Sequence, residues 1–361
     1  MLVKKNLLGS SLTTLEYFFD EINEPKFRAK QLLTWIHKKG ILDFDLMSNF
    51  NKNLRNKLNK IATIKPPTVH KKFVSSEGTV KYLIKLESKS MVEMVIIPEK
   101  NRRTLCVSSQ AGCALQCTFC ATGAQGFHNN LRSEEIVGQL WIANFYDKNK
   151  DEKNITNIVF MGMGEPLLNF DPVVESVKIM KDQYAYGLSR KRVTISTSGI
   201  VPKIYELVSS VDVSLAISLH APENNLRSQI VPINKKYPID SLIEACKAYL
   251  KSYKNKRSIT IEYVLLENVN DSKNHALKLS KLLNGMSCKI NLIPFNNFDG
   301  STYRRPTKKK ISDFKDLLTD KGFITTLRIT RGDEVEGACG QLVGNLSNPI
   351  KGKNLISHAN L

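Results

Sequence analysis

The chain has 361 residues, 42% of them hydrophobic, which is enough for one large catalytic domain and a small accessory domain. No run of eighteen or more apolar residues is present, the mean hydropathy is −0.24, and the N-terminal residues lack the apolar core of a signal peptide. Composition thus argues against a membrane protein and a disulfide-rich secreted protein. We expect a cytoplasmic protein whose seven cysteines serve metal binding or catalysis.

The chain is strongly basic, with a net charge of +19 and a pI of about 9.5. Such an excess of Lys and Arg favours a polyanionic partner such as nucleic acid, because each phosphate contact releases counterions. The same composition also fits lysines that simply face solvent. Charge alone leaves both interpretations open.

Residues 1–70 are predicted to form a small helical accessory domain. A helix is expected from Pro25, with apolar residues at helical spacing, to Gly40, which ends it, and a second helix is expected over residues 48–61. Both carry basic residues, namely Lys26, Arg28, Lys30, His37, Lys38, Lys39, Lys52, Arg55, Lys57 and Lys60. Two short basic helices around a glycine turn fit an RNA-binding module and equally fit a helical cap with solvated lysines.

Residues 71–98 are predicted to be connecting β-strands that follow Pro66 and Pro67. Alternating apolar and polar residues indicate strands over residues 80–86 and 91–97. Glu93 interrupts the second run. On the residues alone, we expect its carboxylate to face solvent from a half-buried strand.

From Thr104 onward, strand patterns alternate with helical patterns, which predicts an α/β fold with a parallel sheet. The expected strands are 104–107, 155–161, 193–197, 213–219, 259–266, 289–293 and 326–329, and the expected helices are 133–146, 172–181, 239–253, 272–283 and 311–321. About six βα units make a partial, TIM-like (βα)6 barrel, which we assign to residues 99–345. Residues 346–361 are expected to form a polar tail.

Small and polar residues follow the predicted strands one after another. They include Gly162 to Pro166, Ser196 to Gly199, Ser218 to Pro222 and Pro294 to Asn297. Because active sites in parallel α/β folds lie at the carboxyl ends of strands, one mouth of the barrel is expected to be rich in functional groups. Individually these are ordinary turn residues.

Cys113, Cys117 and Cys120 form a C-x3-C-x2-C triplet on a glycine-flanked loop. Three thiolates at this spacing suit three irons of a [4Fe-4S] cluster and leave the fourth iron open to S-adenosylmethionine. The alternative is a structural zinc site with Cys106 or His128 as fourth ligand. No second pair of closely spaced cysteines is visible for it, so the cluster is favoured.

Three longer segments have sequences that are typical of one protein family. They read Ser-Ser-Gln-Ala-Gly-Cys over residues 108–113, Phe-Met-Gly-Met-Gly-Glu-Pro over residues 160–166 and Gly-Ala-Cys-Gly-Gln-Leu over residues 337–342. Together with Phe-Arg-Ala-Lys-Gln at residues 27–31, they make nearly the whole chain similar to the RlmN and Cfr family of radical S-adenosylmethionine (radical SAM) RNA methyltransferases. The Ala-Gly-Cys and Gly-Glu-Pro forms resemble the branch that methylates adenine C2.

The resemblance implies the activity and the partners. Its substrates would be an adenine of the peptidyl transferase centre in 23S rRNA and the adenosine 3′ of the anticodon in tRNA, with two S-adenosylmethionine molecules consumed per methylation. A flavodoxin-type electron donor and a monomeric state are implied as well.

The resemblance also implies roles for single residues. Cys339 would carry the methyl group as S-methylcysteine, Glu93 would accept the C2 proton, and Cys106 would resolve the protein–RNA adduct through a transient disulfide with Cys339. The cofactor site would comprise Gly164, Glu165, Ser196, Ser218, Leu219, His220 and Asn296. Without the resemblance, single cysteines such as Cys246 and Cys288 are expected in the core.

Three hypotheses remain. The first is the adenine-C2 methyltransferase. The second is a C8-directed methylase of the Cfr type or another radical enzyme, and the third is a non-catalytic iron–sulfur protein that binds RNA. The position of the methyl group on the product, and the formation of 5′-deoxyadenosine, distinguish them.

Overall fold

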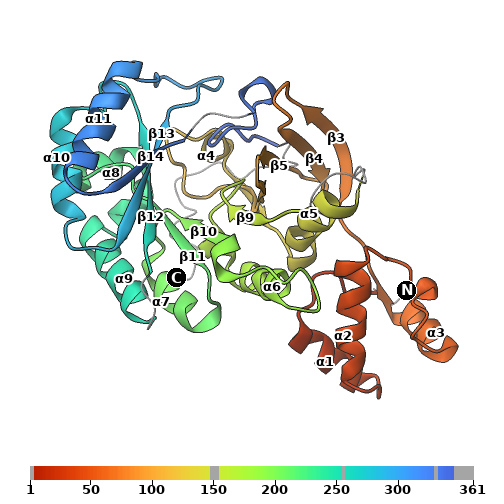
Figure 1. Cartoon of the computed structure of the whole chain (residues 1–361). Helices are drawn as coiled ribbons and strands as arrows, with labels where there is room; N and C mark the ends of the chain where they lie inside the picture. The colour runs from red at the N-terminus through yellow and green to blue at the C-terminus, as the bar shows by residue number, and fades with distance from the viewer. Residues whose placement is uncertain (1–3, 147–153, 254–256, 329–331, 345–361) are drawn as a thin grey trace.

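The structure, a computed structural model, describes residues 4–146, 154–253, 257–328 and 332–344. Its main sheet has ten strands in the order β14-β13-β12-β11-β10-β9-β6-β5-β4-β3 (Figure 1). The polar tail predicted for residues 346–361 lies outside the described residues.

Seven of these strands are mutually parallel and curve into a partial barrel. They are β6 (Arg102–Cys106), β9 (Asn157–Phe160), β10 (Val193–Thr197), β11 (Ser214–Ser218), β12 (Ile259–Leu265), β13 (Cys288–Pro294) and β14 (Ile324–Leu327). The partial TIM-like barrel predicted from the alternation of elements is confirmed, and each predicted strand is present, with bounds that differ by one to three residues in most cases.

Three antiparallel strands extend the same sheet beyond β6. They are β3 (Thr68–Val74), β4 (Val80–Lys85) and β5 (Met91–Glu99), and β5 pairs with β6 so that Val95 lies opposite Cys106. The strands expected to be connectors are therefore hydrogen-bonded to the barrel. β3 was not predicted.

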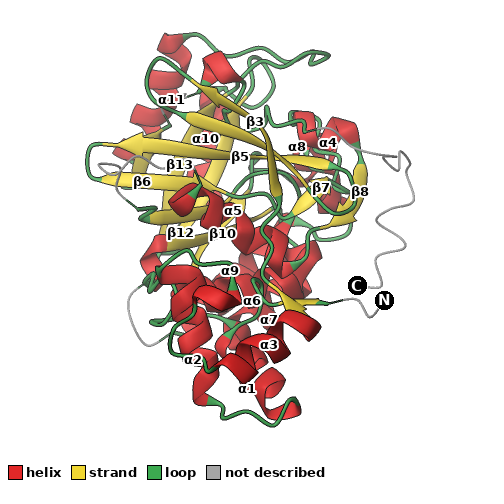
Figure 2. Cartoon of the chain, turned by 90° about the vertical axis from the view of Figure 1, so that its right-hand side faces the viewer, coloured by secondary structure: helices red, strands yellow, loops and turns green. Residues whose placement is uncertain are grey.

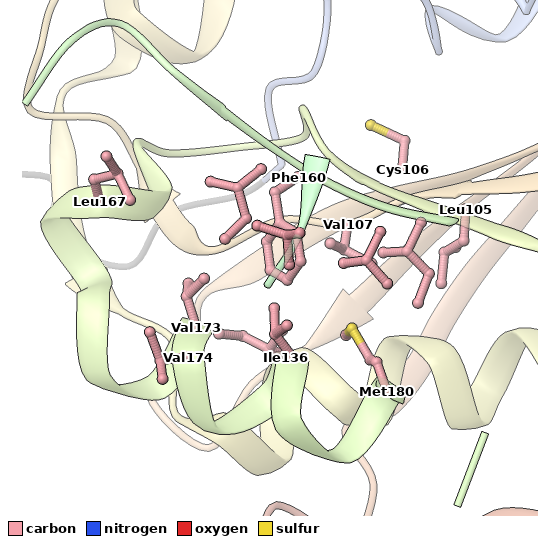
Figure 3. Packing of buried hydrophobic residues seen from close by; sticks show 14 of the residues in the cluster. Leu105, Cys106, Val107, Ile136, Phe160, Leu167, Val173, Val174 and Met180 are labelled. Atoms are coloured by element: carbon pink, nitrogen blue, oxygen red, sulfur yellow. The ribbon is translucent and has the colours of Figure 1, made fainter. Parts of the chain in front are cut away.

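Helices cover the outer face of the barrel strands. They are α5 (Ser133–Phe145), α6 (Phe170–Lys181), α7 (Val201–Ser210), α8 (Asn224–Ile230), α9 (Ile239–Lys251), α10 (Lys273–Leu282) and α11 (Lys308–Asp320). In Figure 3, Phe160 of β9 and the β6 side chain of Leu105 lie among apolar residues of α5 and α6, whereas the Cys106 sulfur points to the opposite side, away from these helices. Successive strand residues face opposite sides of a sheet, so Cys106 faces the barrel interior.

The inward face of the barrel strands is largely polar. Thr194, Thr260 and Asn291 point inward, and the residues that follow them, Ile195, Ile261 and Leu292, are buried against the helices. This alternation differs from the interior of a full TIM barrel, which branched apolar side chains fill. The barrel interior can therefore hold solvent or a ligand.

The N-terminal helices gather at one end of the molecule, below the strands in Figure 2. They are α1 (Leu12–Glu21), α2 (Phe27–Leu33), a π-helical turn (Thr34–Lys38) and α3 (Lys52–Ile61), with β1 (Lys5–Asn6) and β2 (Ala62–Thr63) paired beside them. The sequence predicted the last helix from residue 48 and did not predict α1. Gly40 ends the second helix as expected, with φ of +71°.

The N-terminal unit packs tightly on α5. A Cβ added to Gly9 would lie 2.1 Å from the Glu134 backbone nitrogen, and one added to Gly40 would lie 2.6 Å from the Phe145 ring. Such contacts hold the unit directly against both ends of one barrel helix. None of the described helices is long and apolar enough to cross a bilayer.

Candidate active site

The three clustered cysteines lie between two short strands, β7 (Gln110–Gly112) and β8 (Phe127–Asn130), and the short helix α4 (Ala121–Gln125) begins directly after the third. The Cys113 N–H donates to the Gly126 carbonyl at 2.8 Å, which closes the loop. Cys113, Cys117 and Cys120 all line one cavity of about 160 Å³ at the carboxyl ends of the parallel strands. We call it the cofactor cavity.

The thiols of this cavity fit an iron–sulfur cluster by their chemistry. Burial raises the pKa of all three, that of Cys117 to about 12, and neighbouring thiols raise it further. Bound iron would offset this effect because metal-bound thiols ionise. Among the described residues, no three Cys, His, Asp or Glu side chains converge as tightly as a single metal ion requires, and neither Cys106 nor His128 lines the cavity.

Gly164 and Glu165 follow β9 at the rim of the cofactor cavity. Gly164 has φ of +96°, and a Cβ there would lie 2.4 Å from the Gln110 Cβ. The Gln110 Oε1 accepts a hydrogen bond of 2.9 Å from the Glu165 N–H. Glycine is therefore required both by the backbone conformation and by the close approach of the cysteine loop.

The Glu165 carboxylate is buried and lies between its own turn and the residues that follow β10. It accepts hydrogen bonds from the Ser198 N–H at 2.8 Å and from the Leu167 N–H at 3.1 Å. Burial nevertheless raises its pKa to about 7. Within the described residues this carboxylate forms no ion pair with a cationic side chain, and a carboxylate of this kind at a cavity is suited to bind the ammonium group of an amino acid ligand.

The other predicted cofactor residues are brought together only in part. Ser196, Ser218, His220 and Asn296 line the cofactor cavity. Leu219 does not: its side chain is fully buried in the core. The prediction that Leu219 contacts the cofactor therefore holds at most for its backbone.

His220 serves the fold directly. Its Nδ1 accepts a hydrogen bond of 3.0 Å from the Val264 N–H, and its ring packs edge-on against Phe119 with centroids 4.7 Å apart. Burial lowers its pKa to about 3, so the ring is neutral. Phe119 lies between two cluster cysteines, so His220 supports the cysteine loop.

Arg227 of α8 is a residue that the sequence did not reveal. It is fully buried, and its guanidinium donates to the carbonyls of Leu219 (3.0 Å), Ser198 (2.6 Å) and Ser218 (3.1 Å), with a further bond to Asn234. It thereby joins the ends of β10 and β11. Its one sequence signal is an arginine at a core-facing position beside Ile230 in a short helix.

Cys339 lies on a loop that is docked onto the cysteine loop and lines the same cavity. Its carbonyl accepts a hydrogen bond of 3.2 Å from Asn296, and the Gly340 carbonyl accepts one of 2.8 Å from the Ala121 N–H. Burial raises the pKa of the Cys339 thiol, whereas the Arg328 guanidinium, which is hydrogen-bonded to it, lowers it.

Cys106 is close enough to Cys339 for their charges to interact. Burial raises the Cys106 pKa to about 12, the Cys339 thiol adds to that effect, and Arg328 opposes it. All cysteines of the described structure are free thiols, so the predicted disulfide between these two is not formed here. Cys246 and Cys288 do not line the cofactor cavity.

Glu93 is not the solvent-facing carboxylate expected from its strand pattern. Only 4% of the residue is exposed, and its Oε1 lies 3.0 Å from Lys81 Nζ. Its Oε2 accepts a hydrogen bond of 3.1 Å from the Val343 N–H, which follows the Cys339 loop. The partner lysine comes from the neighbouring strand β4. In this structure Glu93 does not line the cofactor cavity.

Comparison with known proteins identifies the family. Residues 5–64 match the ribosomal RNA large subunit methyltransferase N-terminal domain, and residues 107–279 match the radical SAM superfamily. The dual-specificity RNA methyltransferase RlmN of Pseudomonas putida (strain W619) is 53% identical over 96% of this chain and 91% of its own length. The chain belongs to the RlmN family. A further RlmN protein, from Pseudomonas fluorescens (strain SBW25), is 51% identical over 95% of this chain and 91% of its own length.

A solved structure agrees with the RlmN assignment. The crystal structure of a radical SAM methyltransferase from Sphaerobacter thermophilus is 37% identical, with a TM-score of 0.87, over 94% of this chain and 99% of that chain. The similarity extends over nearly the whole of both chains, so it covers the N-terminal unit of this RlmN-family protein as well as the barrel.

Proposed function

We propose that this chain methylates C2 of adenine in 23S rRNA and in tRNA, with Cys339 as the carrier of the methyl group. The observation that carries the proposal is the position of Cys339, which lines one cavity with Cys113, Cys117, Cys120 and Glu165. A thiol there can receive a methyl group from a sulfonium ligand held by Glu165. The names of the relatives, which are dual-specificity RNA methyltransferases, support RNA as the substrate.

A radical route suits this substrate because adenine C2 is electron-poor and does not displace a methyl group from a sulfonium. A [4Fe-4S] cluster held by Cys113, Cys117 and Cys120 would supply the electron for reductive cleavage of S-adenosylmethionine. Glu165 would bind the ammonium group of that molecule, and Gly164 and Ser196 would line its site.

Cys339 would act twice. Its thiol first loses a proton and takes a methyl group from one S-adenosylmethionine, a step that the neighbouring Arg328 guanidinium favours by stabilising the thiolate. The S-methyl group of Cys339 then gives a hydrogen atom to the 5′-deoxyadenosyl radical that cleavage of a second S-adenosylmethionine would supply, with 5′-deoxyadenosine as the by-product. The resulting carbon radical adds to adenine C2. The methyl carbon now joins Cys339 to the RNA.

Glu93 and Cys106 would release the product. The adduct radical loses the C2 proton, which Glu93 accepts, and one electron, which the cluster held by Cys113, Cys117 and Cys120 would take back. The Cys106 thiolate attacks the Cys339 sulfur, so that an S–S bond forms, the S–C bond breaks, and the carbon takes a proton to become the methyl group. Two electrons from a reductant restore both thiols. Val95 lies two residues after Glu93 on β5 and pairs with Cys106 on β6. This pairing supports the proposal that Glu93 and Cys106 act near each other.

Replacement of the two cysteines tests the proposal in anaerobically reconstituted enzyme. Cys339→Ala should abolish methylation and leave the cluster spectrum intact, and Cys106→Ala should accumulate a covalent protein–RNA adduct visible on a denaturing gel. Cys288→Ser is the matched control and should behave like wild type. Normal turnover by Cys339→Ala would refute the carrier role.

Mass spectrometry of the product separates this proposal from its rivals. A methyl group on C8 would identify the Cfr type of enzyme, and a lack of 5′-deoxyadenosine would identify a non-catalytic protein. We also propose a cytoplasmic monomer that receives electrons from a flavodoxin-type donor, on the strength of the family resemblance.

A further inference from the structure

A second and larger cavity lies inside the barrel. Its volume is about 820 Å³, within the ~300–1,000 Å³ typical of ligand sites, and strand residues such as Thr104, Thr194 and Thr260 line it. We call it the lower cavity, because these residues come from the amino-terminal parts of the strands. The residues that line both cavities are Met161, Glu262, Ile293, Asn296, Arg328 and Cys339.

Cys339 therefore belongs to the wall between the two cavities. The three cluster cysteines and Glu165 line only the cofactor cavity. The cysteine loop and the Cys339 loop are hydrogen-bonded to each other on that side, through Ala121 with Gly340 and through Thr122 with Leu342. A macromolecular substrate reaches Cys339 with less rearrangement from the lower cavity than through these loops.

The rim of the lower cavity is basic. The cationic residues that line it, besides Arg328 in the shared wall, are Arg102, Arg190, Lys191, Arg257 and Lys289. The acidic residues that line it are Glu99, which forms an ion pair of 2.5 Å with Arg102, and Glu262, which lies in the wall with Cys339. Positive charge is thus in excess at the rim, which favours a polyanion.

Arg257 lies at this rim between Tyr253 and Asp212. Its side chain is only 7% exposed, and its guanidinium carbon lies 3.1 Å from the Tyr253 ring centroid. The Nη1 lies 2.7 Å from the Asp212 carboxylate, which holds the guanidinium in place. Lys181 interacts electrostatically with Asp212, Arg257 and Arg190, so cationic side chains outnumber the carboxylate around Lys181.

We propose that RNA binds across this basic rim and that the target nucleotide enters the lower cavity, where it meets Cys339 from the side opposite the cluster. The inference rests on the proposed function. Enzymes that modify a base take it out of the stack into a pocket, and phosphate contacts by Lys and Arg supply most of the affinity. The positive charge of Arg257, together with that of Arg190 and Lys191, attracts the phosphates next to the target nucleotide.

Charge reversal at the two ends of the barrel tests the route. Arg190→Glu with Lys191→Glu alters the lower rim, and Lys308→Glu with Lys309→Glu is the matched control. Lys308 and Lys309 are exposed at the start of α11, and this helix follows β13, so they lie toward the carboxyl ends of the strands. Both variants change the net charge equally.

The measurement is the Kd of an unmodified tRNA transcript for the reconstituted holoenzyme at several salt concentrations. The lower-rim variant should bind at least tenfold more weakly and lose about two from the slope of log Kd against log salt, whereas the control should stay within about twofold of wild type. Equal weakening by both variants, or weakening by the control alone, would overturn the route.

A readout without RNA separates this route from the proposed function. Mass spectrometry of the Cys339 peptide after incubation with S-adenosylmethionine should show the same S-methylation in wild type and in the lower-rim variant. If wild type shows no S-methylation, the proposed function itself fails, whichever rim binds RNA.

A cross-link in wild type avoids any folding defect of a variant. A tRNA transcript with 4-thiouridine beside the target adenosine should, on irradiation, label peptides that contain Arg190 to Arg192 or Arg257 to Ile259. Labelling confined to peptides around Lys308 would overturn the proposal. Arg257→Lys should bind more tightly than Arg257→Met, and equal Kd values for these two variants and wild type would remove Arg257 from the site.

Discussion

Lys81 and Glu93 form an ion pair of 3.0 Å across β4 and β5, with only 5% and 6% of their side chains exposed. Removal of one partner leaves a buried charge, so Lys81→Met should lower the free energy of unfolding by about 3–5 kcal/mol. The double variant Lys81→Met with Glu93→Leu should recover most of that loss. Urea unfolding of the four proteins of this cycle provides the measurement.

The same double variant separates the structural role of Glu93 from its proposed chemistry. A folded protein that accumulates the RNA adduct is expected if Glu93 accepts the C2 proton. A folded double variant that methylates RNA at the wild-type rate would show that another group takes the proton.

Gly164→Ala should weaken S-adenosylmethionine binding. The new Cβ would lie 2.4 Å from the Gln110 Cβ at a φ of +96°. Strain of about 1–3 kcal/mol corresponds to roughly 5- to 150-fold in Kd. Anaerobic titration calorimetry measures it, with Gly285→Ala as control because its φ is +77° but nothing lies within 4 Å of the new Cβ. A similar Kd for the two variants would contradict the role of the close approach.

Binding of S-adenosylmethionine should depend on pH through Glu165. Burial raises the pKa of this carboxyl from 4.5 to about 7, so below pH 7 the free protein holds it protonated and unable to pair with an ammonium group. Affinity should fall about tenfold per pH unit below 7 and level off above. In Glu165→Gln the pH dependence should disappear, and a retained slope would point to another group.

The raised pKa of Glu165 makes the stability of the apoprotein change with pH in the opposite direction to its affinity for S-adenosylmethionine. The protonated form of Glu165 is favoured on folding, so its stabilising contribution is complete below the unfolded value of 4.5 and is lost as the pH rises through about 7. Comparison of wild type with Glu165→Gln in urea at pH 5 and pH 8 should show this difference.

Arg227→Met should destabilise the fold and the cofactor site together. It leaves the carbonyls of Ser198, Ser218 and Leu219 without their buried donor, which corresponds to roughly 3 kcal/mol or more. Arg132→Met is the control, because the Arg132 side chain is 50% exposed and its ion pairs contribute less than about 1 kcal/mol. Equal unfolding midpoints for the two variants would contradict this assignment.

The basic face of α3 should contribute to RNA affinity if the N-terminal unit binds RNA. Lys52 and Lys60 are exposed on it. Charge reversal of both should raise the Kd for tRNA and reduce its salt dependence. An unchanged Kd would assign these helices to packing alone.

The barrel strands could be predicted from sequence because their signal is local. Inward polar and outward apolar residues alternate over residues 193–196 of β10 and 259–263 of β12, and β10 has the bounds that were predicted. The cysteine triplet could also be recognised from the sequence, because its three cysteines lie within a segment of eight residues. Such features need no knowledge of distant partners.

The features that could not be predicted depend on partners far along the chain. Glu93 was expected to face solvent, yet Lys81 on the next strand allows its burial. Arg227 contradicts the apolar face expected of a buried helix, and its partners are the strand-end carbonyls of β10 and β11. α1 is a different case, because it was not predicted although Leu15, Phe18 and Phe19 recur at helical spacing.

The position of Cys339 between two cavities has an evolutionary consequence. In the arrangement that we propose, the small sulfonium ligand and the nucleic acid would be recognised by different sets of side chains, which meet at the wall shared by the two cavities. Substitutions around the lower rim can therefore accumulate, and shift the choice of RNA target, while the residues that generate the radical stay the same. A scaffold of this kind can acquire new targets without reinventing its chemistry.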